Sequence, residues 1–121
     1  MDIAYVNVFV TDLDRSSEFY RQTLGLALEQ ADPAHGYASL LAGPIRLGLV
    51  VAGEDQAELV GCHTGVGLET KDLEADYARL VAAGVVFTMP PTRQAWGGYM
   101  AVLADPDGNL FYLDEVSAAH G

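Results

Sequence analysis

Five side chains carry the chemistry that this sequence offers most clearly: Tyr5, Asn7, Arg46, Glu69 and Tyr112. Their phenol, amide, guanidinium and carboxylate groups supply hydrogen-bond donors and acceptors and one charge of each sign. A few such groups, set in an apolar surface, are what orient a bound small molecule. Three further aromatic side chains are expected to add that surface: Phe9, Trp96 and Tyr99.

The same residues make a weak catalytic set. No Ser-His-Asp or Cys-His arrangement can be read from the sequence. A Glu69 carboxylate paired with Arg46 would be held ionised and would accept a proton poorly. We therefore predict no catalytic residue. An enzyme that uses Glu69 or a tyrosine as its acid or base stays an alternative, as does a purely structural Arg46–Glu69 pair beside core aromatics.

Strand alternation is what would bring these side chains together. In residues 3–10 the valines Val6, Val8 and Val10 share one face, which we assign to a covering helix. The same alternation places the other residues on the opposite face: Tyr5, Asn7, Phe9, Arg46, Gly48, Val50, Gly65, Gly67, Glu69, Leu110, Tyr112 and Asp114.

The chain reads as two copies of one pattern, strand–helix–strand–strand–strand. The first copy has strands near 3–10, 26–30, 37–41 and 45–51, and a helix that begins at Thr11-Asp12 and ends at Gly25. Residues 52–64 show no clear element. The second copy has strands near 66–70, 85–89, 99–103 and 110–113, a helix from Asp72 to Gly84, and a break at Pro90-Pro91.

An internal repeat supports this reading. Asp12-Leu13 matches Asp72-Leu73 at an offset of 60, and Gly36-Tyr37 matches Gly98-Tyr99 at an offset of 62. We predict a single α+β domain over 1–121, made of a first unit at 1–51, a linker at 52–63, a second unit at 64–116 and a tail at 117–121.

The last hairpin carries a family resemblance. Asp105-Pro106-Asp107-Gly108 supplies a tight turn between two strands, and Trp96-Gly97-Gly98, Met100-Ala101 and Leu110 flank it. This string resembles the vicinal-oxygen-chelate superfamily of glyoxalases, extradiol dioxygenases and bleomycin-resistance proteins, and most of all the bleomycin-resistance branch. The resemblance implies two tandem βαβββ units that form a curved mixed sheet around a cavity, with helices on the outer face, and a homodimer in which the partner completes each cavity.

The resemblance also implies where a divalent metal would be held. Metal-dependent members set His, Gln or Glu at four inward positions, and the matching positions here are Tyr5, Gly48, Gly65 and Tyr112. Glycine has no side chain, and a phenol keeps its proton at neutral pH and binds divalent ions poorly. We therefore predict no metal and no cofactor. A displaced metal site around His63 or Glu69 is the alternative.

The composition limits the classes of molecule that this protein is expected to bind. Seventeen acidic and six basic residues give a net charge of −11, which argues against nucleic acid and favours a cationic small molecule over an anionic one. The aromatic side chains of the predicted face add an aromatic ligand to this expectation. No apolar run reaches the length of a membrane span, and a single cysteine, Cys62, excludes an internal disulfide. We expect a cytoplasmic protein with no membrane partner. The favoured function is sequestration of an antibiotic or metabolite, and the alternative is a glyoxalase-like or dioxygenase-like enzyme.

Overall fold

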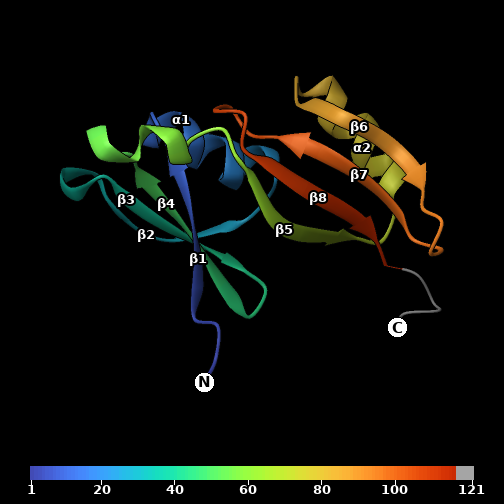
Figure 1. Ribbon diagram of the computed structural model, residues 1–121, viewed down its shortest axis with the longest axis horizontal. Coiled ribbons are helices and arrows are strands. Elements are labelled where there is room, and N and C mark those ends of the chain that lie inside the picture. Colours follow the sequence, from blue (N-terminus) through green and yellow to red (C-terminus); the bar gives the residue numbers. More distant parts are fainter. Residues whose placement is uncertain (117–121) are drawn as a thin grey trace. The chain divides into compact units, whose positions relative to one another are not determined.

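The computed structural model describes residues 1–116, and the predicted tail at 117–121 lies outside the described residues. Contacts divide the chain into two compact units (Figure 1). The first comprises residues 1–62 and 106–109. The second comprises residues 63–105 and the described residues from Leu110 onward. No helix in the described part of the chain is long and apolar enough to cross a membrane.

The first unit holds a four-stranded mixed sheet, sheet 1, with strand order β1-β4-β3-β2. Strand β1 pairs in parallel with β4, and the other pairs are antiparallel. The elements are β1 (Tyr5–Val10), α1 (Leu13–Glu18), η1 (Phe19–Thr23), β2 (Ala27–Asp32), η2 (Pro33–His35), β3 (Tyr37–Ala42), β4 (Ile45–Val51) and η3 (Glu54–Leu59).

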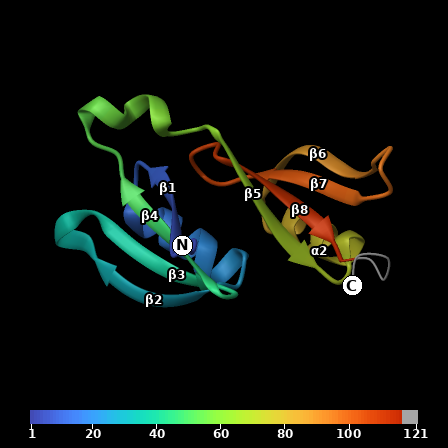
Figure 2. The ribbon, with the colours of Figure 1, turned by 60° about the horizontal axis from the view of Figure 1, so that its bottom comes forward.

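The core of the first unit lies between sheet 1 and the helix (Figure 2). Val8, Val10, Leu40, Leu47 and Leu49 are between 0 and 3% exposed, as strand alternation requires of a helix-covered face. Val8 and Val10 confirm the predicted helix side of the first strand.

The helix begins one residue later than the sequence pattern suggests. Asp12, not Thr11, is the N-cap, and its side chain accepts a hydrogen bond from the backbone N–H of Arg15 at 3.1 Å. After Glu18 the helix widens into one π-helical segment, η1. Gly25 then ends it with a φ of +82°, a conformation that glycine adopts without the strain of a side chain.

The second unit repeats the arrangement in sheet 2, with strand order β5-β8-β7-β6. Its elements are β5 (His63–Thr70), α2 (Leu73–Ala82), β6 (Val86–Arg93), β7 (Tyr99–Ala104) and β8 (Leu110–Glu115). Asp72 caps α2 by accepting from the Ala75 N–H at 3.0 Å, as Asp12 caps α1. Leu80 of α2 and Phe111 of β8 are buried between helix and sheet.

Two local predictions are corrected here. Residues 54–59, read as linker, form the 3₁₀ helix η3. Pro90 and Pro91, read as a break, lie inside β6, which bulges there. Strand β6 is at the sheet edge, where a missing backbone N–H leaves no interior ladder bond unmade.

The turn between β7 and β8 belongs to the first unit through its polar side chains. Asp107 accepts hydrogen bonds from Thr11 N at 3.1 Å and from Arg15 Nη2 at 2.8 Å. Asn109 is 1% exposed, donates to the Phe9 carbonyl at 2.9 Å, and accepts from the N–H groups of Gly61 and Cys62. The turn therefore reverses the chain and also hydrogen-bonds to the first unit through Asp107 and Asn109.

The α+β class and the two four-stranded mixed sheets are confirmed. Each unit places its helix on one face of its sheet and leaves the other face without one (Figure 1). We call these second faces the open face of sheet 1 and the open face of sheet 2. The predicted division into one domain, with units at 1–51 and 64–116, stays a prediction.

Candidate functional site

The open face of sheet 1 carries an ion pair between Arg46 and Glu29 that was not predicted from the sequence. Arg46 Nε lies 2.7 Å from Glu29 Oε1, and the Ser39 hydroxyl donates to the same carboxylate at 2.9 Å. These hydrogen bonds, that of Arg46 first, lower the pKa of Glu29. Arg46 on β4 therefore has its own ionic partner within sheet 1, Glu29 on β2, two strands away, and an Arg46–Glu69 pair is not needed to neutralise it.

Beside this pair, Asn7 covers Gly48. The two residues are opposite each other in the β1–β4 register, and the Asn7 amide oxygen occupies the place that a Cβ at Gly48 would take. Tyr37 borders the same spot, 3.4 Å from that Cβ position. No hydrogen bond within residues 1–116 engages the Asn7 amide, so it can serve a ligand. Tyr5, 60% exposed, and the half-buried Phe9 flank Asn7 on β1.

The open face of sheet 2 is shaped by a bulge in β5. His63 pairs with Leu110 and Gly67 pairs with Tyr112, so β5 carries two more residues than β8 over this stretch. Gly65 sits in the bulge with a φ of +73°. Thr64 closes it by donating to the Leu110 carbonyl at 2.7 Å and accepting from the Val66 N–H at 3.1 Å.

The bulge brings His63 onto Tyr112. Their ring centroids are 4.6 Å apart at an interplanar angle of 51°. The Gly65 N–H donates to His63 Nδ1 at 3.0 Å, which makes this nitrogen an acceptor and leaves Nε2 to carry the proton of the neutral ring. This pair gives the face a tilted aromatic surface with a phenol and an imidazole at its edge.

Two carboxylates stand further along the same strands. Glu69 and Asp114 are opposite each other in the β5–β8 register. Burial, and then the charge of Glu69, raises the pKa of Asp114. Neither carboxylate has a cationic partner within residues 1–116. A cationic group of a ligand would therefore be attracted to this end of the face.

The two predicted site aromatics of the second unit's β6–β7 hairpin are Tyr99 and Trp96. Tyr99 is on the helix side, where its hydroxyl is 3.0 Å from Glu74 of α2 and its ring lies 4.4 Å from the Arg93 guanidinium. Its predicted place on the ligand face is wrong, because Tyr99 shares the strand parity of the buried Ala101 and Leu103. Trp96 precedes β7, is 65% exposed, and lays its ring over Gly98.

The family now follows from a direct comparison. The model of the Glyoxalase/Bleomycin resistance protein/Dioxygenase superfamily matches residues 2–113. This chain belongs to that superfamily. The superfamily assignment confirms the resemblance at its coarse level, and it does not by itself choose a branch.

Relatives within the superfamily differ in what they are said to do. A probable lactoylglutathione lyase of Vibrio cholerae serotype O1 is 30% identical, over 98% of this chain and 93% of that protein. A superfamily member from Sphaerobacter thermophilus is also 30% identical, with a TM-score of 0.83 over 96% of this chain and 98% of that one. TnmS3, an antibiotic binding protein from Streptomyces sp. CB03234, is 30% identical, with a TM-score of 0.81 over 97% of both chains.

The residues at the four positions that would hold a superfamily metal do not fit one. Gly48 offers no side chain, and the Asn7 amide fills the space above it. Gly65 is in the bulge, and Tyr5 and Tyr112 offer only phenols. No three His, Cys, Asp or Glu side chains among the described residues group closely enough to hold an ion. The absence of a metal remains our prediction, now with a physical reason at Gly48.

Three residues of these faces were not among the predicted site residues: Glu29, His63 and Asp114. Strand alternation already places Asp114 on the same face as Tyr112, but its carboxylate was not assigned a ligand role. His63 was considered only for an alternative metal site, and its contact with Tyr112 could not be predicted because it depends on the bulge. Glu29 depends on the register of β2 against β3, which shifts between Leu28 and Gln30.

Proposed function

We propose that this chain is a metal-independent protein that binds a small molecule carrying an aromatic group and a positive charge, and that it sequesters such an antibiotic or metabolite. The observation that carries the proposal is the open face of sheet 2. There the His63–Tyr112 ring pair lies beside Glu69 and Asp114, two carboxylates with no cationic partner within residues 1–116. An aromatic cation matches both halves of that surface.

The open face of sheet 1, taken by itself, is a second surface that could bind a small molecule. Tyr5 and Phe9 offer aromatic surface, and the Asn7 amide offers a donor and an acceptor. Arg46 and Glu29 would order the edge of that face through their ion pair. The likeness to TnmS3, described as an antibiotic binding protein, supports this function over others that the superfamily contains.

Calorimetric titration tests the proposal. Metal-free bleomycin and ethidium, an aromatic cation, are titrated into the protein and into Tyr112→Ala and Asp114→Asn. We expect each substitution to weaken binding of at least one probe about tenfold, the free energy of one ring contact or charge-assisted contact. Tyr99→Phe is the matched control, because Tyr99 lies on the helix side of the same sheet. Equal affinity in wild type and both site variants would refute the proposed face.

A second candidate function is lyase activity, which the 30% identity to the probable lactoylglutathione lyase favours. It needs an acid or base on the same faces, for which Asp114, Glu69 or His63 would be the choice. The two functions separate in one experiment: protein purified without chelator is analysed for metal and assayed as a lactoylglutathione lyase with added Zn²⁺, Ni²⁺, Mn²⁺ or Fe²⁺. Near-stoichiometric metal with turnover would replace the binding function by the enzymatic one.

A further inference from the structure

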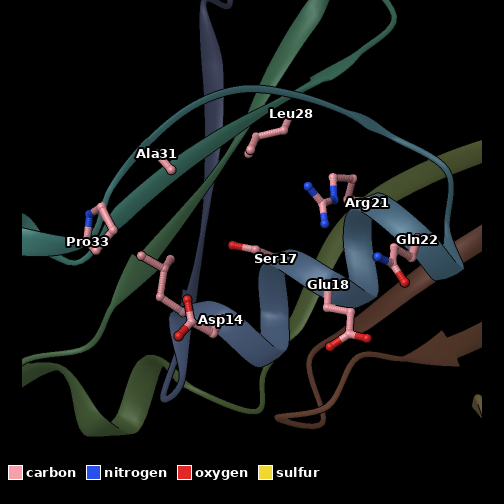
Figure 3. A pocket seen from close by; sticks show the side chains of 9 residues that line it. Asp14, Ser17, Glu18, Arg21, Gln22, Leu28, Ala31 and Pro33 are labelled. Carbon is pink, nitrogen blue, oxygen red and sulfur yellow. The ribbon is translucent and has the colours of Figure 1, made fainter.

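A pocket lies on the opposite side of sheet 1 from its open face, between the helix and the edge strand β2 (Figure 3). It is an open depression of about 460 Å³, and most of the side chains that line it are exposed to solvent. It exists because α1 packs over β3 and β4, and β2 extends beyond the helix. The pocket is formed entirely by residues of the first unit.

The two walls of the pocket differ in chemistry. The wall from β2 and η2 is apolar, made by Leu28, Ala31 and Pro33. The wall from the helix is polar, and Figure 3 shows the Arg21 guanidinium and the Ser17 hydroxyl directed into the space between the two walls. A ligand that fills the pocket must therefore have an apolar side and a polar side.

The charged groups of the polar wall are not used by the protein itself. Within residues 1–116, neither Arg21 nor Asp14 takes part in an ion pair or a side-chain hydrogen bond. Glu18, three residues before Arg21, is likewise unpaired within that range. Arginine presents a planar fork of donors that fits a carboxylate in a bidentate way.

Asp14 and Arg21 stand toward opposite ends of the polar wall, and Glu18 lies between them in the sequence. Asp14 and Arg21 are seven residues apart, roughly 10 Å at the helical rise, and Figure 3 places Asp14 toward Pro33 and Arg21 toward Leu28. Arg21 lies on η1, and π-helical segments occur often at functional sites. The pocket thus offers Arg21 at one end, with Glu18 one turn away, Asp14 at the other end, and an apolar wall joining them.

We propose that this pocket is a second binding site, for zwitterionic molecules with an apolar body, of the size of an apolar dipeptide. Arg21 and Ser17 bind the carboxylate, Asp14 binds the ammonium group, and Leu28, Ala31 and Pro33 contact the apolar side chains. A two-residue peptide spans about 7 Å, which suits the separation of the two charged ends once each ionic contact is allowed for. This site is distinct from the proposed sequestration site, which lies on the other face of the sheets.

The test uses leucyl-leucine as the probe and NMR chemical-shift titration of the ¹⁵N-labelled full chain as the readout. We expect shifts to gather at α1, η1 and β2, and Arg21→Gln to weaken binding about tenfold, the loss of one charge-assisted contact. Lys71→Gln is the matched control, since it removes the same charge from a residue outside the pocket. Its affinity should stay within about twofold of wild type.

Two modified probes identify the ends of the ligand. Leucyl-leucine amide lacks the carboxylate and should bind wild type as weakly as leucyl-leucine binds Arg21→Gln, with no further loss in that variant. N-acetyl-leucyl-leucine lacks the ammonium group and should be insensitive to Asp14→Asn. Shifts that are absent, that lie outside the pocket, or that persist unchanged in Arg21→Gln would overturn the site. Tyr112→Ala should leave this binding unaltered, so failure of the sequestration function and failure of this site are told apart.

Discussion

Ionisation of the Asp114 carboxyl group lowers the stability of the folded state. Burial and the neighbouring charge of Glu69 raise its pKa above the ordinary value. An acid with a raised pKa in the folded state is penalised once the pH exceeds its unfolded pKa, about 3.9, and the penalty is complete above the folded pKa. The ionised Asp114 therefore lowers the stability of the folded state at neutral pH.

We therefore expect Asp114→Asn to melt higher than wild type at pH 7, by about 1–3 °C, and to lose that advantage at pH 3, where the carboxyl is protonated in both states. Glu29→Gln should behave in the opposite way. The pKa of Glu29 is lowered by Arg46 and Ser39, so its contribution is present at pH 7 and is lost in acid. Thermal melts across pH 3–8 check both. Parallel curves for Asp114→Asn and wild type would contradict this assignment.

Asn109 carries a structural role at the scale of one side chain. It satisfies the N–H groups of Gly61 and Cys62 and the carbonyl of Phe9, and it is buried. Asn109→Ala leaves these backbone groups without their partner, and we expect a loss of roughly 3 kcal/mol in the free energy of unfolding. Urea titration measures it. Asn7→Ala, an exposed asparagine on the open face of sheet 1, should cost less than about 0.5 kcal/mol.

At the scale of elements, the bulge in β5 shapes the proposed ligand-binding face of sheet 2. Gly65 has a φ of +73°, and no atom lies within 4 Å of the Cβ that a substitution would add there. Any cost of Gly65→Ala therefore comes from the backbone alone. Gly67, two residues on, has an ordinary φ, but its added Cβ would stand 3.1 Å from Asp114 Oδ2.

These neighbouring glycines give a matched pair of variants. Gly65→Ala should destabilise the protein by about 1–2 kcal/mol and change the environment of the His63 ring, seen in its NMR resonances. Gly67→Ala should cost less, because a carboxylate can move aside, yet it should alter probe binding near Asp114. If the His63 resonances are the same in both variants, the bulge does not position the ring.

At the scale of the whole molecule, exposed apolar residues and unpaired edge strands favour association of two copies. Strands β1 and β5 are edges of their sheets, and Ile3, Tyr5, Leu41 and Val86 are exposed. Pairing two copies would bury such groups, although the high negative charge opposes association at low salt. We expect a homodimer, in agreement with the family resemblance.

Sedimentation equilibrium at micromolar concentration, in 0.15 M salt, checks the assembly. The expected mass is twice that of the 12.9 kDa chain. Tyr5→Glu adds a charge at an exposed apolar position and should shift the equilibrium toward the monomer. A single 12.9 kDa species for wild type would rule out the dimer.

Local patterns in the sequence were enough to predict many of the helix ends, turns and strand faces of this protein. Helix starts at Asp12 and Asp72, left-handed stops at Gly25 and Gly84, and the turn at Gly108 each depend on a few adjacent residues, and all are present. Strand alternation separated the buried face from the open one for the same reason, because it has a fixed period of two residues.

Contacts between residues that are far apart in the sequence could be learned only from the tertiary structure. His63 reaches Tyr112 because β5 is bulged against β8, about 45 residues away, and the strand pattern of β5 contains no sign of it. Arg46 is neutralised by Glu29 because a register shift brings β2 into place. The pocket at Arg21 arises where a short helix leaves an edge strand uncovered. Registers and packing offsets are set by hydrogen bonds and contacts between segments, and no local sequence period encodes them.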